Sequence, residues 1–184
     1  MIFIFIFETV LNLTKSAFID VYGTNPDVTI ENNEYSEVQK VMEKTGAYVH
    51  DCVFSYCTSE TAGGALLCTV VDKLYIEQTT FYSCKTYSKS GGAIYAMHYF
   101  GQCAMIGICW FNCSSTYNPG NYGQFAYTSF QDDRKTFKNH INDSSISHTL
   151  KTDSNSRSTL GMYYNDVLCK SINILHSMLT QQIR

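Results

Sequence analysis

Hydrophobic and polar residues alternate along much of the chain, a pattern typical of β-strands rather than helices. The alternation is clearest in TVVDKLYIEQTTF (69–81) and AMIGICWF (104–111). In the first of these, the period of two places Leu74 and Ile76 on one face. Neither run shows the apolar spacing of three and four residues that an amphipathic helix requires. The pattern therefore predicts an all-β domain.

A Gly-Gly-Ala unit occurs twice, in SETAGGALLC and in YSKSGGAIYA. Gly63 and Gly64 begin the first unit, and Gly91 and Gly92 begin the second, so the spacing is 91 − 63 = 28. Glycine permits positive φ angles and close approach between backbones. We predict that each pair lies where the chain turns a corner.

A second unit, aromatic-x-x-Cys, occurs three times, as FSYC, FYSC and WFNC. Its aromatic positions are spaced by 81 − 54 = 27 and then by 110 − 81 = 29, which matches the period of the glycine pairs. Two markers with one period indicate an internal repeat. The aromatic and cysteine positions are Phe54 and Cys57, Phe81 and Cys84, and Trp110 and Cys113.

A repeat of this length built from short strands favours a β-solenoid, in which coils stack in parallel about 4.8 Å apart. Helical repeats would need long amphipathic runs, and the chain has none. Stacking would place equivalent residues directly above one another. We therefore expect an interior aromatic ladder of Phe54, Phe81 and Trp110, and a thiol ladder of Cys57, Cys84 and Cys113 at the next bend.

TAGGALLC and SGGAIYA, with their preceding aromatic-x-x-Cys units, resemble the repeats of polymorphic outer-membrane-type adhesins. Those repeats pair a GGAI motif with an FxxN motif, and cysteine replaces the asparagine here. This cysteine-rich form is similar to β-helix surface proteins of anaerobic flagellate protists. The resemblance covers roughly residues 46–127. It implies a right-handed parallel β-helix of the pectin lyase-like kind, with about four to six coils of about 27–29 residues.

We expect one domain over residues 1–184, either complete or part of a longer protein. Residues 1–45 would form an irregular first coil, with strands in TVLNLTKSAFIDVYG and DVTIENN separated by the turn GTNPD. YSEVQKVMEK fits a short helix or an irregular excursion. Residues 128–184 would form degenerate last coils. The apolar run MIFIFIF is too short for a transmembrane span and lacks the basic start of a signal peptide, which favours a buried strand or the start of a longer chain.

The charge balance argues against nucleic acid as a partner, which would need a clustered basic face. Charged residues make up 16% of the chain, the net charge is −3, and there is no basic cluster. No phosphate-binding loop or dinucleotide motif is present, so no cofactor is expected.

Cysteine is abundant, with eight residues in 184. This abundance is typical of a disulfide framework in a secreted chain. Zinc is disfavoured because no CxxC pair occurs. Parallel side chains in stacked coils give poor disulfide geometry, so we favour free thiols over disulfides for the ladder. The cysteines are at positions 52, 57, 68, 84, 103, 109, 113 and 169.

No catalytic constellation is evident. Asp132 and Asp133 weakly resemble the paired aspartates of polygalacturonases, but the companion motifs are missing, and adjacent strand residues point to opposite faces. The five histidines lack ligand spacing or a partnered nucleophile, and no metal site is expected. They are His50, His98, His140, His148 and His176.

Three N-glycosylation sequons occur, at Asn12, Asn112 and Asn142, and they fit an extracellular or cell-surface location. We expect a non-enzymatic module that mediates adhesion or interaction with glycans or proteins. Two alternatives stay open: a polysaccharide lyase or hydrolase without obvious motif spacing, and a truncated remnant without independent function.

Overall fold

A computed structural model describes residues 17–87, 89–98, 100–116, 125–130, 139–147, 160–163 and 168–175. Within these ranges the chain is all-β apart from one short helix, and the strands form three sheets in which every pairing is parallel. Asn12, the run MIFIFIF, Asp132, Asp133, His148 and His176 lie outside the described residues.

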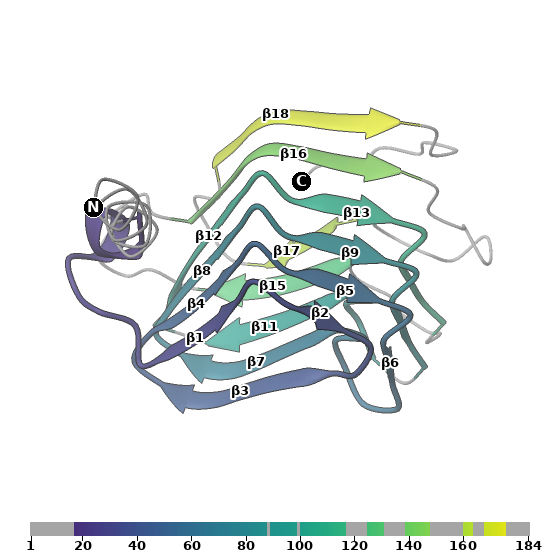
Figure 1. The fold of residues 1–184 in the computed structure, drawn as a ribbon, viewed down its shortest axis with the longest axis horizontal. Coiled ribbons are helices and arrows are strands. Elements are labelled where there is room, and N and C mark those ends of the chain that lie inside the picture. The colour runs from purple at the N-terminus through teal and green to yellow at the C-terminus, as the bar shows by residue number, and fades with distance from the viewer. Residues whose placement is uncertain are drawn as a thin grey trace, which may run out of the picture.

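The largest sheet is bent and has two arms, which Figure 1 shows as a sharp change of direction in every layer. Its first arm contains β1 (Val28–Glu31), β4 (Ala47–His50), β8 (Lys73–Glu77) and β12 (Gln102–Ile106). Its second arm contains β2 (Glu34–Tyr35), β5 (Val53–Ser55), β9 (Thr80–Tyr82) and β13 (Cys109–Phe111). β16 (His140–Ser147) and β18 (Leu168–Leu175) run through both arms, since β16 pairs with both β12 and β13.

Two further sheets contain the remaining strands. The three-stranded sheet contains β6 (Thr58–Ser59), β10 (Lys85–Thr86) and β14 (Ser114–Ser115). The five-stranded sheet contains β3 (Gln39–Lys44), β7 (Leu66–Val71), β11 (Ile94–His98), β15 (Ala126–Phe130) and β17 (Leu160–Tyr163). We call each passage of the chain through these sheets a rung. β1 to β3 form the first rung and β4 to β7 the second.

The register between rungs follows the sequence period. Phe54 pairs with Phe81, and Phe81 pairs with Trp110. In the five-stranded sheet Leu66 pairs with Ile94, so the segments after the two Gly-Gly-Ala units also lie side by side. The later rung spacing is longer, since Ala104 pairs with His140.

The bend between the two arms is made by a residue in the left-handed region in each of five rungs. Their φ angles lie between 44° and 65°. Asn, Asp and Gly adopt this conformation at low cost. In three rungs, the side chain of the residue that follows the left-handed one donates a hydrogen bond to the backbone carbonyl of the residue that precedes it. These are Cys52 to His50 O at 3.1 Å, Thr79 to Glu77 O at 2.7 Å and Ser144 to Asn142 O at 2.8 Å. The left-handed residues are Asn32, Asp51, Gln78, Gly107 and Asp143.

The second bend, after β5, β9 and β13, also contains a residue in the left-handed region in each rung. Tyr56, Ser83 and Asn112 have φ angles of 56°, 51° and 52°. The next residue in each rung is a cysteine of the expected thiol ladder. One local geometry thus serves two bends, with a cysteine at every copy of the second bend.

The interior is lined by the inward side chains of all the sheets. Phe54, Phe81 and Trp110 are completely buried, and their rings stack with centroids 5.1 Å and 6.4 Å apart. Tyr35 extends this stack at one end, 5.0 Å from Phe54, and Phe125 lies 6.2 Å from Trp110. Burying each aromatic side chain contributes roughly 1.5–3 kcal/mol.

The glycine pairs lie where neighbouring rungs come very close. Gly63 and Gly91 have φ angles of 59° and 78°. Such angles strain any residue that bears a side chain. A Cβ on Gly64 would lie 2.1 Å from the carbonyl oxygen of Gly92. The second glycine of the unit is therefore required by the contact between rungs.

Residues 17–22 are helical, so the strand expected across TVLNLTKSAFIDVYG is wrong over this segment. Phe18 and Tyr22 are four residues apart, which places both rings on one side of a helix. That side packs on Tyr48, with the Phe18 ring 5.9 Å away, and Tyr22 donates to Leu74 O at 2.8 Å. Gly23 has a φ of 69°. A glycine in this conformation commonly ends a helix, as it does here.

The segment YSEVQKVMEK forms the end of β2 and all of β3. β3 lies at the edge of the five-stranded sheet and pairs with β7. In the described part of the chain, no helix has the length and hydropathy needed to span a membrane.

Candidate functional site: an aromatic face, a thiol ladder and a polar network

The outer surface of the second arm carries aromatic and hydroxyl side chains. β5, β9 and β13 have the sequences VFS, TFY and CWF, and none contains a charged residue. The central residue of each strand points inward, so the two flanking residues point outward. We call these outward side chains, together with Tyr56, the aromatic face. Its members are Val53, Ser55, Tyr56, Thr80, Tyr82, Cys109 and Phe111.

Aromatic rings dominate this face. Tyr82 and Phe111 stack in parallel, with centroids 5.1 Å apart and planes at 5°. Tyr56 meets Tyr82 edge to face, at 5.2 Å and 77°, and is 65% exposed. A hydrogen bond with Tyr82 raises the pKa of the Tyr56 hydroxyl. Val53 is 37% exposed beside them.

Asn112, in one of the three sequons, lies at the second bend next to this face. It is half-buried, and its Nδ2 donates to Ser83 Oγ at 2.9 Å. Ser114, the third residue of that sequon, is buried. Asn142 is half-buried on β16, and its Oδ1 has no hydrogen-bond donor among the described residues. A glycan on Asn112 would be attached to the nitrogen that makes this bond and would leave it a single N–H.

The cysteines after the second bend are completely buried, one above another. Each thiol donates to the carbonyl of an aromatic residue in the preceding rung: Cys57 to Tyr35 O at 3.3 Å, Cys84 to Phe54 O at 3.4 Å, and Cys113 to Phe81 O at 3.4 Å. The thiol thus makes a hydrogen bond between rungs at the position where the resembling repeats have asparagine.

Cys57 and Cys84 are poor nucleophiles. Contact with Cys84 and burial raise the pKa of Cys57, and contact with Cys113 raises the pKa of Cys84. Burial raises the pKa of Cys68 to about 12 and also raises that of Cys103. Thiolates are the reactive form, so these groups stay inert near neutral pH. The seven cysteines whose side chains the structure describes are all free, and within this part no group of three or more His, Cys, Asp or Glu residues could hold a metal ion.

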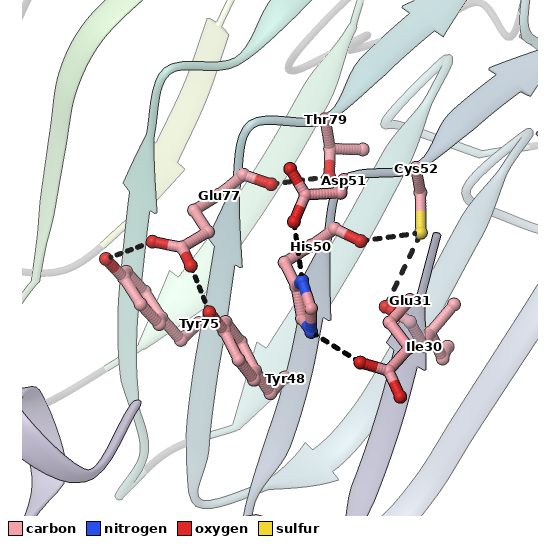
Figure 2. A network of polar contacts seen from close by, with 9 residues as sticks. All are labelled: Ile30, Glu31, Tyr48, His50, Asp51, Cys52, Tyr75, Glu77 and Thr79. Atoms are coloured by element: carbon pink, nitrogen blue, oxygen red, sulfur yellow. Dashed lines mark hydrogen bonds and ion pairs between the residues drawn. The ribbon is translucent and has the colours of Figure 1, made fainter. Parts of the chain in front are cut away.

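A polar network lies on the outer surface of the first arm (Figure 2), and its two tyrosines pack in one cluster with Phe18 and Tyr22 of the helix. Tyr48 and Tyr75 stack at 5.4 Å, and both hydroxyls donate to the carboxylate of Glu77, that of Tyr75 at 2.9 Å. Burial, followed by the bond to Glu77, raises the pKa of both phenols. Both tyrosines therefore stay protonated and act as donors.

His50 forms the second half of the network. Its Nε2 lies 3.1 Å from Glu31 Oε2, and its Nδ1 lies 2.8 Å from Asp51 Oδ2. Its ring stacks on Tyr48 with centroids 4.3 Å apart. The imidazole is 2% exposed, whereas the two carboxylates are 47% and 44% exposed.

The alternation pattern did not single out this network. Tyr48 and Tyr75 occupy equivalent positions of successive rungs, but His50 and Glu77 do so with different chemistry, and only the register brings the four side chains together. Of the remaining histidines in the described residues, His98 lies 3.4 Å from Asp72, and His140 begins β16. The imidazole at the centre of the network is almost completely buried, which favours a structural role over proton transfer to a substrate.

Comparisons with protein-family models, with curated proteins and with solved structures find no match. The function is therefore argued from the residues of this chain.

Proposed function

We propose that the chain is a right-handed parallel β-helix that works as a non-enzymatic interaction module of a surface or secreted protein. Two observations support a solenoid: pairing is parallel throughout the described sheets, and equivalent positions of the sequence repeat pair with one another from rung to rung. The GGAI-like resemblance supports the right hand, and the sequons fit an extracellular location.

The aromatic face carries this proposal. It spans three rungs without a charged residue and offers tyrosine, serine, threonine and phenylalanine side chains to solvent. Tyrosine gives a large contact area at a low cost in conformational entropy, and small hydroxyl residues add adaptable hydrogen bonds. A surface of this composition suits a neutral, extended partner. Glycan chains and uncharged polypeptide segments are the two partner classes that fit.

A binding screen tests the proposal. The purified chain is applied to a glycan array and to a panel of extracellular-matrix and cell-surface proteins, and the strongest ligand is then titrated. Tyr56→Ala should weaken its binding about tenfold or more, since an exposed aromatic anchor contributes at least about 1.4 kcal/mol. Phe100→Ala is the matched control, because Phe100 is equally exposed, at 65%, and lies on the connection between β11 and β12.

Two results would overturn the proposal. One is the absence of binding to any member of either panel. The other is a ligand whose affinity falls equally in the Tyr56→Ala and Phe100→Ala variants, because that outcome places the contact elsewhere. Circular dichroism of both variants checks that the fold is intact.

A further inference from the structure

His50 is a buried histidine with a carboxylate at each ring nitrogen. Glu31 is its register partner on β1, and Asp51 follows it at the first bend. A neutral imidazole has one N–H and can donate to one carboxylate, whereas an imidazolium donates to both. We infer that Glu31, His50 and Asp51 form a proton-dependent clamp, which holds the first rung on the second and releases it when the imidazole loses its proton.

Two contacts besides the carboxylates hold the His50 ring in place. The face of the Tyr48 ring covers the imidazole with centroids 4.3 Å apart. At such a distance a ring face attracts a positive charge. The Cys52 thiol donates to the backbone carbonyl of His50 and so leaves the ring nitrogens to the carboxylates. No lysine or arginine takes part in the network shown in Figure 2. The titratable groups around the clamp are Glu31 from β1, Tyr48 from β4, Asp51 and Cys52 from the bend, and Tyr75 and Glu77 from β8.

Loss of the proton leaves a nitrogen lone pair of the buried imidazole facing a carboxylate oxygen at about 3 Å. Asp51 is the next residue in the chain after His50, so its side chain stays close to the ring. Glu31 is on β1, which has a neighbouring strand on one side only in the described sheet. The repulsion is therefore relieved by movement of β1 or of the Glu31 side chain, which is 47% exposed, and either movement removes this contact between the rungs.

Release of the first rung would uncover surface that is now paired. Tyr35, on β2, covers one face of the Phe54 ring at 5.0 Å. The backbone edges of β4 and β5 would also be exposed, and open edges of this kind pair readily with other strands. The clamp thus makes access to this end of the stack depend on pH.

Amide hydrogen exchange tests the clamp in the intact chain. The readout is the protection factor, which removes the intrinsic pH dependence of exchange. Imidazole changes charge near neutrality, so protection of the β1 amides should fall about tenfold between about pH 6 and about pH 8.5. The amides of β9, in the middle of the stack, should keep their protection over this range.

Two first-rung variants separate the clamp from general charge effects. Glu31→Gln should abolish the pH response of β1, because an amide can accept from or donate to either form of the ring. Glu34→Gln removes the same charge from the same rung without touching His50, and should keep the full response. His50→Gln should behave like Glu31→Gln.

The inference is overturned if β1 protection is flat across the titration, or if Glu31→Gln responds to pH as the unmodified chain does. Nitrogen NMR of the His50 ring gives a second readout. Two protonated ring nitrogens at about pH 6, with loss of one in step with β1 protection, support the clamp. A single neutral tautomer throughout contradicts it.

Discussion

Gly64 and Gly92 lie in adjacent rungs so close together that a Cβ on Gly64 would sit 2.1 Å from the Gly92 carbonyl oxygen. The same Cβ would lie 2.5 Å from the carbonyl oxygen and 2.6 Å from the amide nitrogen of Lys85. These neighbours are backbone atoms of paired rungs and cannot rotate away. The recurrence of Gly-Gly-Ala therefore reflects a spacing between rungs that excludes any side chain.

Gly64→Ala should destabilise the chain by about 3 kcal/mol, because the rungs must separate to admit a methyl group. Urea unfolding measures the change. Gly23→Asn is the control, since a Cβ there meets nothing within 4 Å. Asparagine also tolerates the positive φ of this position. Equal destabilisation by both variants would contradict the close approach of the rungs.

Phe81→Ala should cost about 3–5 kcal/mol, because it opens a cavity in the middle of the aromatic ladder. Phe81→Leu should cost less, since leucine fills most of that space. Tyr87 is 47% exposed. Tyr87→Ala should therefore change stability by roughly 0.5 kcal/mol at most. Chemical denaturation of the three variants checks the order, and similar values for all three would contradict an interior ladder.

Alkylation of the native chain should label Cys109 before any ladder cysteine. Cys109 is half-exposed on the aromatic face, whereas Cys57, Cys84 and Cys113 are buried donors to backbone carbonyls. Peptide mass spectrometry gives the order of labelling. Unfolding without reductant should then make all eight cysteines available, and any cysteine still protected would indicate a disulfide.

The repeated features of this chain were predictable from sequence, because each consists of the same kind of residue at several positions one period apart. The glycine pairs, the aromatic ladder and the thiol ladder all lie where the sequence period places them. The first bend was not predictable, because its left-handed residues have the same backbone conformation but differ in residue type. They are Asn, Asp, Gln, Gly and Asp in successive rungs.

Features that do not recur with the sequence period were not predicted, for a different reason. The described helical residues, 17–22, cover less than two turns, so Phe18 and Tyr22 are the only pair among them that shows a helical period within a strand-like composition. The network of Tyr48, His50 and Glu77 depends on register between strands of successive rungs, which no local pattern reveals. The aromatic face depends on which residues of short strands point outward, and the burial of Phe54, Phe81 and Trp110 shows this.

Stability should fall as pH rises above about 8.5, where unfolded thiols ionise. The pKa of buried Cys68 is raised to about 12, so between these values the folded state binds one proton more than the unfolded state. Each such thiol lowers stability by about 1.4 kcal/mol per pH unit in this window. Cys68→Ala should make the dependence of stability on pH less steep, as measured by unfolding at several pH values. Alanine is already present at its register partner, Ala96. Val41→Ala, at the partner on the other side, should lower stability equally at every pH and leave the slope unchanged.

Trp110→Phe should change stability by less than about 1 kcal/mol, although the indole is completely buried. The indole nitrogen has no hydrogen-bond acceptor among the described residues, so its burial carries a penalty of about 1–3 kcal/mol that phenylalanine removes. This gain offsets the smaller volume of phenylalanine, which already occupies the equivalent position at Phe54 and Phe81. Trp110→Ala has no such compensation and should cost about 3–5 kcal/mol. Urea unfolding of both variants distinguishes the two terms, because a Trp110→Phe variant as unstable as Trp110→Ala would show that the indole N–H is bonded in the folded chain.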